Sequence, residues 1–396
     1  MRKPVRDRQN RQAGRSEQAQ SPKAQSPEAQ SSKAQPPKTQ SPKAQSPAAG
    51  TAGAGDVGDN SLIEAGILPA SHWEPIQQQW SDCDSAYSEA ISSTASLSSS
   101  ILEYRTLHGR TYHSEIGNAN AWAPNDAQHT ESMDLYHHVC TLVLDEKLYL
   151  APIKKDIKKA IDIGTGTGIW AIDFADEFPN TEVTGTDVSV IQPSWVPPNL
   201  KFVIDDANMD WTWNDNTFDF IHVRLFYGAI ADWPKFYREA FRVCAPGGWL
   251  EHHEATVEWR SEGGVIHEDS PMGQWSKVYW EGGRKFGRTF RVIEDDIQKT
   301  GMEEAGFEDI VIKDFKCPIG GWPKDPKQKQ LGMFAQLTLE SDIEGYILYM
   351  WNAVMGWSTE EIRVYIAHLR RQLRDPTVRP WYQHRVVYGR KPGKPS

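Results

Sequence analysis

The sequence predicts an α/β protein in which helices cover both faces of a doubly wound, mostly parallel sheet. Strand and helix patterns alternate from about residue 159 onward, which is the arrangement that builds such a sheet. A glycine-rich turn joins the first strand to its helix, and an acidic residue ends the second strand. No segment approaches the roughly 20 apolar residues that a membrane helix needs, so no membrane association is expected.

Residues 1–75 are predicted to form a disordered basic tail rich in Pro, Gln and Ser. Gln recurs every five residues from 20 to 45, in units such as SPKAQ and SPEAQ. An interval of five fits neither helix nor strand, and the segment buries too little apolar surface to offset its ordering entropy. We interpret the tail as a solvated spacer. A regulatory role is the alternative, because four serines precede Pro and six arginines and lysines precede residue 16.

Charge and cysteine content narrow the classes of function. Residues 1–50 carry ten Lys and Arg against three Asp and Glu, so the net charge of −10 leaves −17 on the rest. An acidic body does not favour direct binding of nucleic acid through a broad basic face. The four cysteines are far apart and form no CxxC pair, which argues against disulfides and a zinc ribbon. The expected location is cytoplasmic, with the nucleus as the alternative.

Two ordered regions are expected after the tail. Residues 76–140 are predicted to be an N-terminal helical segment, with a helix starting near Asp134. Residues 141–396 are predicted to hold the α/β domain, including a helical cap at about 265–375 that is rich in Trp and Tyr. A strand at Trp381–Tyr388 is expected to close the sheet.

The turn Gly164-Thr165-Gly166-Thr167-Gly168 follows a short apolar strand that contains Asp162. Glycines let the backbone turn tightly and approach a ligand, and the next helix offers free N–H groups. A second strand ends at Asp187, where a carboxylate can accept both ribose hydroxyls of an adenosine. The predicted adenosine-binding residues are therefore Asp162, Gly164, Thr165, Gly166, Gly168 and Asp187.

The spacing selects among adenosine cofactors. The dinucleotide fingerprint needs a glycine at position 169, where this chain has Ile169, and no Lys follows the glycines as in a phosphate loop. An acid at the strand end suits a cationic ligand better than a phosphate. The sequence therefore predicts S-adenosylmethionine, with a nicotinamide enzyme or a degenerate binding domain as alternatives. Asp205 and Asp206, after the third strand, are candidates for the adenine amino group, and the alternative role for each is a helix N-cap.

Several motifs resemble the LaeA-like methyltransferases of filamentous fungi. The block from Ile161 to Phe174, the run IQPSWVPPN from Ile191 and the run DWPKFY from Asp232 carry this resemblance. It implies a class I methyltransferase fold, Rossmann-like and seven-stranded, that uses S-adenosylmethionine and has a connection with fungal secondary metabolism. The segments 225–230 and 250–254 depart from the family pattern, which puts the acceptor in doubt but not the cofactor.

His222, at the end of the fourth strand, is the first candidate for an acceptor-facing base, followed by Tyr227 and His253. A buried histidine bonded to backbone is the alternative for His222. Arg224 is expected to pair with a carboxylate of the cofactor or of the substrate. The alternative is an ion pair with an acidic residue of the folded domain. No metal site is expected, because the adjacent residues in His137-His138 and His252-His253 point apart on a helix or a strand.

The leading hypothesis is an S-adenosylmethionine-dependent methyltransferase that acts on an apolar or aromatic small molecule of secondary metabolism. The aromatic cap favours this hypothesis, because rings can cover an apolar acceptor. The alternative is a nuclear regulator of secondary metabolism genes that works through protein partners, which the basic tail favours. A third hypothesis is a pseudoenzyme that binds the cofactor without turnover.

Overall fold

An eight-stranded sheet forms the centre of the computed structural model, which describes residues 62, 64–73, 104–113 and 121–393. The strand order is β5-β4-β3-β6-β7-β10-β8, and β9 also pairs with β10. The strands are β3 (Lys159–Ile163), β4 (Glu182–Asp187), β5 (Leu200–Ile204), β6 (Phe218–Arg224), β7 (Cys244–Ala255), β8 (Arg260–Ser261), β9 (Glu308–Pro318) and β10 (Pro380–Arg390). The described residues all lie in the unit Gly58–Ser396.

The sheet is parallel over β5, β4, β3, β6 and β7, and it turns antiparallel at β10. The chain therefore starts in the middle of the sheet at β3, moves outward to β5, and returns to β6 on the other side of β3. This reversal of strand order creates a crevice at the carboxyl ends of β3 and β6, where ligands bind in such folds. The predicted doubly wound α/β fold is confirmed.

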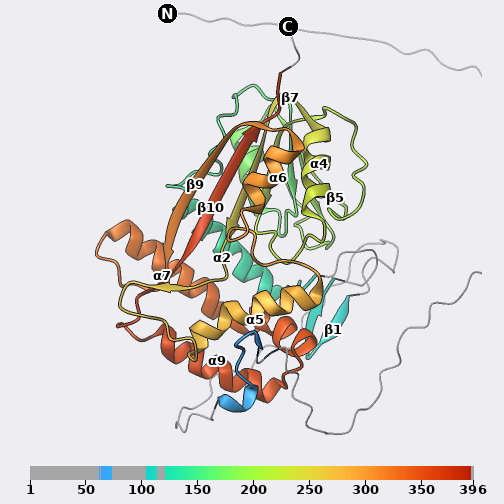
Figure 1. Cartoon of the computed structure of the whole chain (residues 1–396). Helices are drawn as coiled ribbons and strands as arrows, with labels where there is room; N and C mark the ends of the chain where they lie inside the picture. The colour runs from blue at the N-terminus through green and yellow to red at the C-terminus, as the bar shows by residue number, and fades with distance from the viewer. Residues whose placement is uncertain (1–61, 63, 74–103, 114–120, 394–396) are drawn as a thin grey trace, which may run out of the picture. The chain divides into compact units, whose positions relative to one another are not determined.

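Three helices cover the parallel strands. They are α3 (Ile169–Glu177), α4 (Trp233–Val243) and α6 (Ile297–Ala305). Figure 1 shows α4 and α6 side by side over one face of the sheet. Their apolar side chains share a buried cluster with β3, β6 and β7, whereas α3 contributes Trp170 and Phe174 to a separate cluster. Helices thus bury both faces of the sheet, so most residues of the central strands β3, β4 and β6 are buried.

A second layer of helices gathers at the end of the sheet where the parallel strands finish (Figure 1). Their aromatic and aliphatic side chains form a large buried cluster with Val386 of β10 and Ala255 of β7. The elements are α2 (Ala127–Val143), α5 (Pro271–Phe286), α7 (Pro326–Ser341), α8 (Ile343–Leu348), the π-helix η2 (Tyr349–Val354) and α9 (Thr359–Leu373).

The N-terminal part of the chain is tied to this helical layer. Residues 70–72 form the short helix η1, and Arg105–Leu107 and Arg110–Tyr112 form the hairpin strands β1 and β2. The Arg110 guanidinium donates to the carboxylates of Asp126 and Asp342 at 2.6–2.9 Å. These acids are the N-caps of α2 and α8, so one partly buried cation joins the hairpin to two helices.

Several predicted boundaries change in the structure. Helix α2 starts at Ala127 rather than near Asp134, because Asp126 caps it by accepting from the His129 N–H. The predicted cap at 265–375 is too broad, since α6 and β9 belong to the sheet region. The segment 76–140 contains a hairpin as well as helix. The sheet has eight strands because the two-residue β8 adds to the edge of β10.

The predicted tail repeats and Ser-Pro sites lie outside the described residues, as does the whole segment 74–103. Of the cysteines in the described ranges, Cys140, Cys244 and Cys317 are all free and buried. None of the helices described is long and apolar enough to cross a lipid bilayer.

Candidate active site

A cavity of about 270 Å³ opens at the carboxyl ends of the parallel strands. Its lining comes from the connections that follow β3, β4, β5 and β6, and one side is closed by α2. The predicted residues that line it are Asp162, Gly164, Thr165, Gly166, Asp187, Asp205, Asp206 and Tyr227. Three other predicted residues, Gly168, His222 and His253, do not appear in this lining.

The glycine turn approaches its neighbours too closely for any side chain. Gly164, Gly166 and Gly168 have φ of +68°, +58° and +82°, in the left-handed region that disfavours other residues. A Cβ at Gly164 would overlap the ring of Phe226, and one at Gly166 would overlap the Met133 side chain. Gly168 lies behind the cavity as the N-cap of α3. The turn therefore exposes bare backbone to the cavity.

Asp162 joins the glycine turn to the strand below it. One carboxylate oxygen accepts from the Thr165 hydroxyl at 2.6 Å, and the other accepts from His222 Nδ1 at 2.7 Å. The His222 ring stacks on Trp170, with ring centres 3.7 Å apart. Burial lowers the pKa of His222, so we assign it as a neutral imidazole that orients Asp162. The structure thus places His222 behind Asp162, where it cannot contact an acceptor, and its partner is a carboxylate rather than backbone.

Asp187 holds the turn from the opposite side. Its oxygens accept from the Gly166 N–H at 2.8 Å and from the Ser189 N–H at 2.9 Å. The Gln192 amide closes this arrangement by donating to the Gly166 and Ser189 carbonyls at 2.6 and 3.0 Å. Burial raises the pKa of Asp187 to about 6, although the two N–H bonds oppose the rise. Each carboxylate oxygen keeps a further acceptor position for a ligand hydroxyl.

Asp206 offers an acceptor that no neighbour uses. Its Oδ1 accepts from the Asn208 backbone and side-chain nitrogens at 2.9 and 3.1 Å. Its Oδ2 is buried and has no hydrogen-bond partner among the described residues. Neither Asp205 nor Asp206 caps a helix, because the next helix in the chain is α4. A buried acceptor without a donor is costly, so this oxygen fits a ligand amino group.

Helix α2 supplies one wall of the first cavity. Met133, Tyr136 and His137 line the cavity, whereas His138 packs on Phe334 instead. Arg224 of β6 also lines it and donates to His137 Nδ1 at 3.2 Å. The His137 Nε2–H then donates to Asp173 at 3.0 Å. No carboxylate within the described ranges forms an ion pair with Arg224, which leaves its charge facing the cavity.

A second cavity, of about 70 Å³, adjoins the first. Tyr136 and Tyr227 line both cavities, so their rings stand at the boundary. None of the described residues that line the second cavity has a charged side chain. Its lining consists of Tyr136, Tyr227, Ala255, Thr256, Val257, Trp259, Trp275, Tyr279, Ile319, Ala335, Thr338, Leu339, Tyr346 and Tyr382.

Most residues that line the second cavity were not predicted from the sequence. The residues come from α2, β7, α5, α7, α8 and β10 and from the loops between them, and no local spacing connects them. The aromatic content of the cap was the one available signal. His253 lies outside both cavities, where its Nε2 and His384 Nδ1 are 2.8 Å apart.

Comparison with known proteins agrees with this geometry. A methyltransferase domain family matches residues 135–311. Methyltransferase pytC of Aspergillus terreus is 36% identical over 320 residues, which cover 81% of this chain and 98% of that protein. The secondary metabolism regulator LAE1 of Cochliobolus heterostrophus is 30% identical, over 72% of this chain and 94% of that protein. The secondary metabolism regulator laeA of Gibberella zeae is also 30% identical, over 73% and 92%.

The strand order, the glycine turn and the acids at the ends of β4 and β5 define a class I methyltransferase that uses S-adenosylmethionine. The free Asp206 oxygen and the bare backbone of the turn fit the adenosine of this cofactor. The chain belongs to the LaeA-like methyltransferase family of filamentous fungi. The predictions of fold, cofactor and enzyme class are thus confirmed.

Proposed function

We propose that the protein methylates a small apolar or aromatic molecule whose reacting end lies in the second cavity, with the cofactor in the first. The observation that carries this proposal is the shared wall, since Tyr136 and Tyr227 line both cavities. A lining without charges, dominated by aromatic rings, favours an apolar acceptor. Its volume of about 70 Å³ suits one ring of a small molecule and does not suit a macromolecule.

In the first cavity, Asp187 would hold the ribose, and Asp206 would hold the adenine amino group. Asp162 and the glycine carbonyls would face the cationic methionine end, and Arg224 would pair with a carboxylate of the cofactor or the acceptor. The bound cofactor supplies an electrophilic methyl group. The task of this chain is then to align the acceptor with that methyl and to exclude water.

No residue at the boundary is suited to take a proton from the acceptor. Burial raises the pKa of Tyr136 and of Tyr227, so both hydroxyls are donors at neutral pH. His137 already uses both ring nitrogens, and His222 is held by Asp162. The arrangement therefore favours an acceptor atom that ionises readily, such as a phenolic or carboxylic oxygen. The two tyrosine hydroxyls would orient that oxygen.

Filling the second cavity tests the proposal. Ala335→Phe adds a ring to the second lining, while Ala367→Phe adds the same ring to an exposed position of α9. We expect both variants to bind S-adenosylmethionine as the wild type does in calorimetry. A deletion strain should lack one product and accumulate a compound lighter by one CH₂. The wild type and Ala367→Phe should restore the product, and Ala335→Phe should fail.

A nuclear regulatory role is the second candidate, because LAE1 and laeA carry the name of regulators. Removing residues 1–60 separates the two functions. Unchanged product methylation supports the role in metabolite synthesis. Loss of nuclear accumulation together with silencing of many pathways supports the regulator, as would full complementation by Ala335→Phe.

A further inference from the structure

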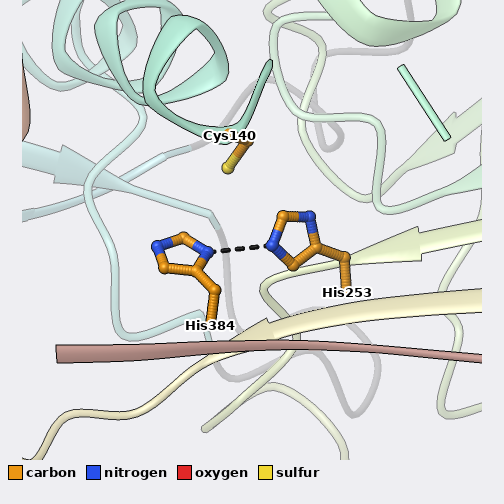
Figure 2. Close-up of side chains that lie close together, drawn as sticks. All are labelled: Cys140, His253 and His384. Atoms are coloured by element: carbon orange, nitrogen blue, oxygen red, sulfur yellow. Dashed lines mark hydrogen bonds between the residues drawn. The ribbon is translucent and has the colours of Figure 1, made fainter. Parts of the chain in front are cut away.

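Three side chains that could bind a metal ion meet where α2 packs on the sheet. They are Cys140 of α2, His253 of β7 and His384 of β10, and one ligand atom of each lies within 4.8 Å of the others. Figure 2 shows the Cys140 sulfur directed toward the space beside the two imidazoles. The dashed contact joins His253 Nε2 and His384 Nδ1 at 2.8 Å.

The fold buries these polar groups with few partners. Cys140, His253 and His384 are at most 1% exposed. The contact between the two imidazoles satisfies one nitrogen of each, and His384 Nε2 is buried without a hydrogen-bond partner among the described residues. Buried polar atoms are normally paired, because an unpaired one loses its hydration without compensation. Because Nε2 is not one of the two nitrogens that face each other, the support for a metal site is the close approach of the three ligand atoms.

We propose that Cys140, His253 and His384 bind one zinc ion. One thiolate and two imidazoles are a ligand set that zinc prefers, and three protein ligands leave a fourth position for water. A neutral imidazole is the form that coordinates metals. Binding would replace the proton of the Cys140 thiol, which leaves to solvent.

The required rearrangement is small. With zinc–nitrogen bonds of about 2.0–2.1 Å and a zinc–sulfur bond of about 2.3 Å, tetrahedral geometry puts the nitrogens about 3.3 Å apart and the sulfur about 3.6 Å from each. The nitrogens would separate by about half an ångström from their 2.8 Å contact. The sulfur–nitrogen distances needed are shorter than 4.8 Å, the limit within which all three ligand atoms already lie from one another.

The neighbours suit a thiolate ligand. The Arg224 guanidinium lies beside Cys140, and a neighbouring cation favours a thiolate. Tyr136 lies one turn before Cys140 on α2, and its ring stands against His384 with centres 6.0 Å apart. An ion in this position would tie α2 to β7 and β10. It would thereby fix Tyr136, which stands at the boundary between the cavities, and Arg224, which lines the first cavity.

Metal content tests the proposal without an activity assay, and the outcome does not depend on the proposed acceptor. The full chain would be grown with zinc and purified without chelators or a polyhistidine tag. Plasma mass spectrometry should then find about one zinc per chain. Cys140→Ser should reduce the zinc to background, and Cys244→Ser, which removes a buried thiol outside the cluster, should leave it unchanged.

Cobalt exchange provides a second measurement that does not need a variant to fold. Cobalt in the wild-type protein should show a sulfur-to-metal charge-transfer band and intense visible bands of tetrahedral coordination. His384→Gln should change these bands. A wild-type protein that holds no stoichiometric zinc and gives no charge-transfer band overturns the proposal, as does zinc that persists in a folded Cys140→Ser variant.

Discussion

The two cavities of this protein are built in opposite ways. The first is lined by turns that follow successive parallel strands, and its polar groups include backbone atoms and four carboxylates, those of Asp162, Asp187, Asp205 and Asp206. The second is lined by side chains drawn from positions 136 to 382, without a charged group among them. The same fold thus presents a polar site that local sequence determines beside an apolar site that depends on long-range packing.

This difference indicates how each cavity responds to substitution. A turn that positions N–H and carboxylate groups recognises one cofactor in any member of the fold. A cavity walled by aromatic side chains from several helices can change shape by substitution without disturbing the sheet. We therefore expect substitutions in the first cavity to affect cofactor binding and stability, and substitutions in the second to affect the acceptor alone.

The largest effect is expected from Gly164→Ala. Its backbone has φ of +68°, and the added Cβ would overlap the Phe226 ring. Left-handed strain and overpacking together should lower the free energy of unfolding by about 2–5 kcal/mol. Urea denaturation measures this change. Gly247→Ala is the matched control, because φ is +81° there and nothing lies within 4 Å of the added Cβ. Equal losses in both variants would show that the contact with Phe226 is unimportant.

Asp187→Ala should weaken S-adenosylmethionine binding by about 1.5–3 kcal/mol, the range for hydrogen bonds to a charged group. The variant also removes the acceptor for the Gly166 and Ser189 N–H groups. Titration calorimetry measures the loss, and Asp176→Ala, an exposed acid on α3, serves as the control. An unchanged affinity in Asp187→Ala would reject the assignment of this carboxylate to the ribose.

Cofactor affinity should depend on pH through the same carboxylate. The pKa of Asp187 is raised to about 6 in the free protein, and the ionised form is the better acceptor for ribose hydroxyls. Affinity should therefore rise by about tenfold per pH unit, or about 1.4 kcal/mol, below pH 6 and level off above it. Calorimetry between pH 5 and 8 checks this profile. Asp187→Asn should flatten it, and a profile that the variant leaves intact would assign the titration to another group.

The smallest effect is expected from Tyr227→Phe. The hydroxyl has no hydrogen-bond partner within the described part of the chain, so its removal should change stability and cofactor affinity by less than about 0.5 kcal/mol. Thermal unfolding and calorimetry measure these quantities. A cofactor affinity reduced tenfold or more would place the hydroxyl against the cofactor and would blur the division between the two cavities.

Much of the first cavity was predictable from the sequence. The strand–turn–helix spacing around Gly164 and the acid at 187 identified the class of cofactor and several residues that line the first cavity. The prediction for His222 identified a residue near the site, but its role as a base required an exposed ring. Burial against Trp170 and the bond to Asp162 could not be read from strand periodicity, which places a side chain on a face without showing what covers it.

The expectation that no metal site is present rested only on adjacent histidines. It holds for His252 and His253, which bond to different partners in the structure, Glu254 and His384 respectively. It could not consider Cys140 and His384, because 244 residues separate them along the chain. Only the packing of α2 on β7 and β10 brings such positions together.

By itself, the sequence determined the order of strands and helices, the glycine turn and the class of cofactor, because these depend on residues within a few turns of one another. Tertiary structure decided which aromatic rings wall the second cavity, which histidines are buried behind the site, and that Cys140 meets two of them. The physical reason is that burial and side-chain contacts in a packed interior depend on neighbours distant in sequence, whereas backbone turns and helix periodicity depend on neighbours along the chain.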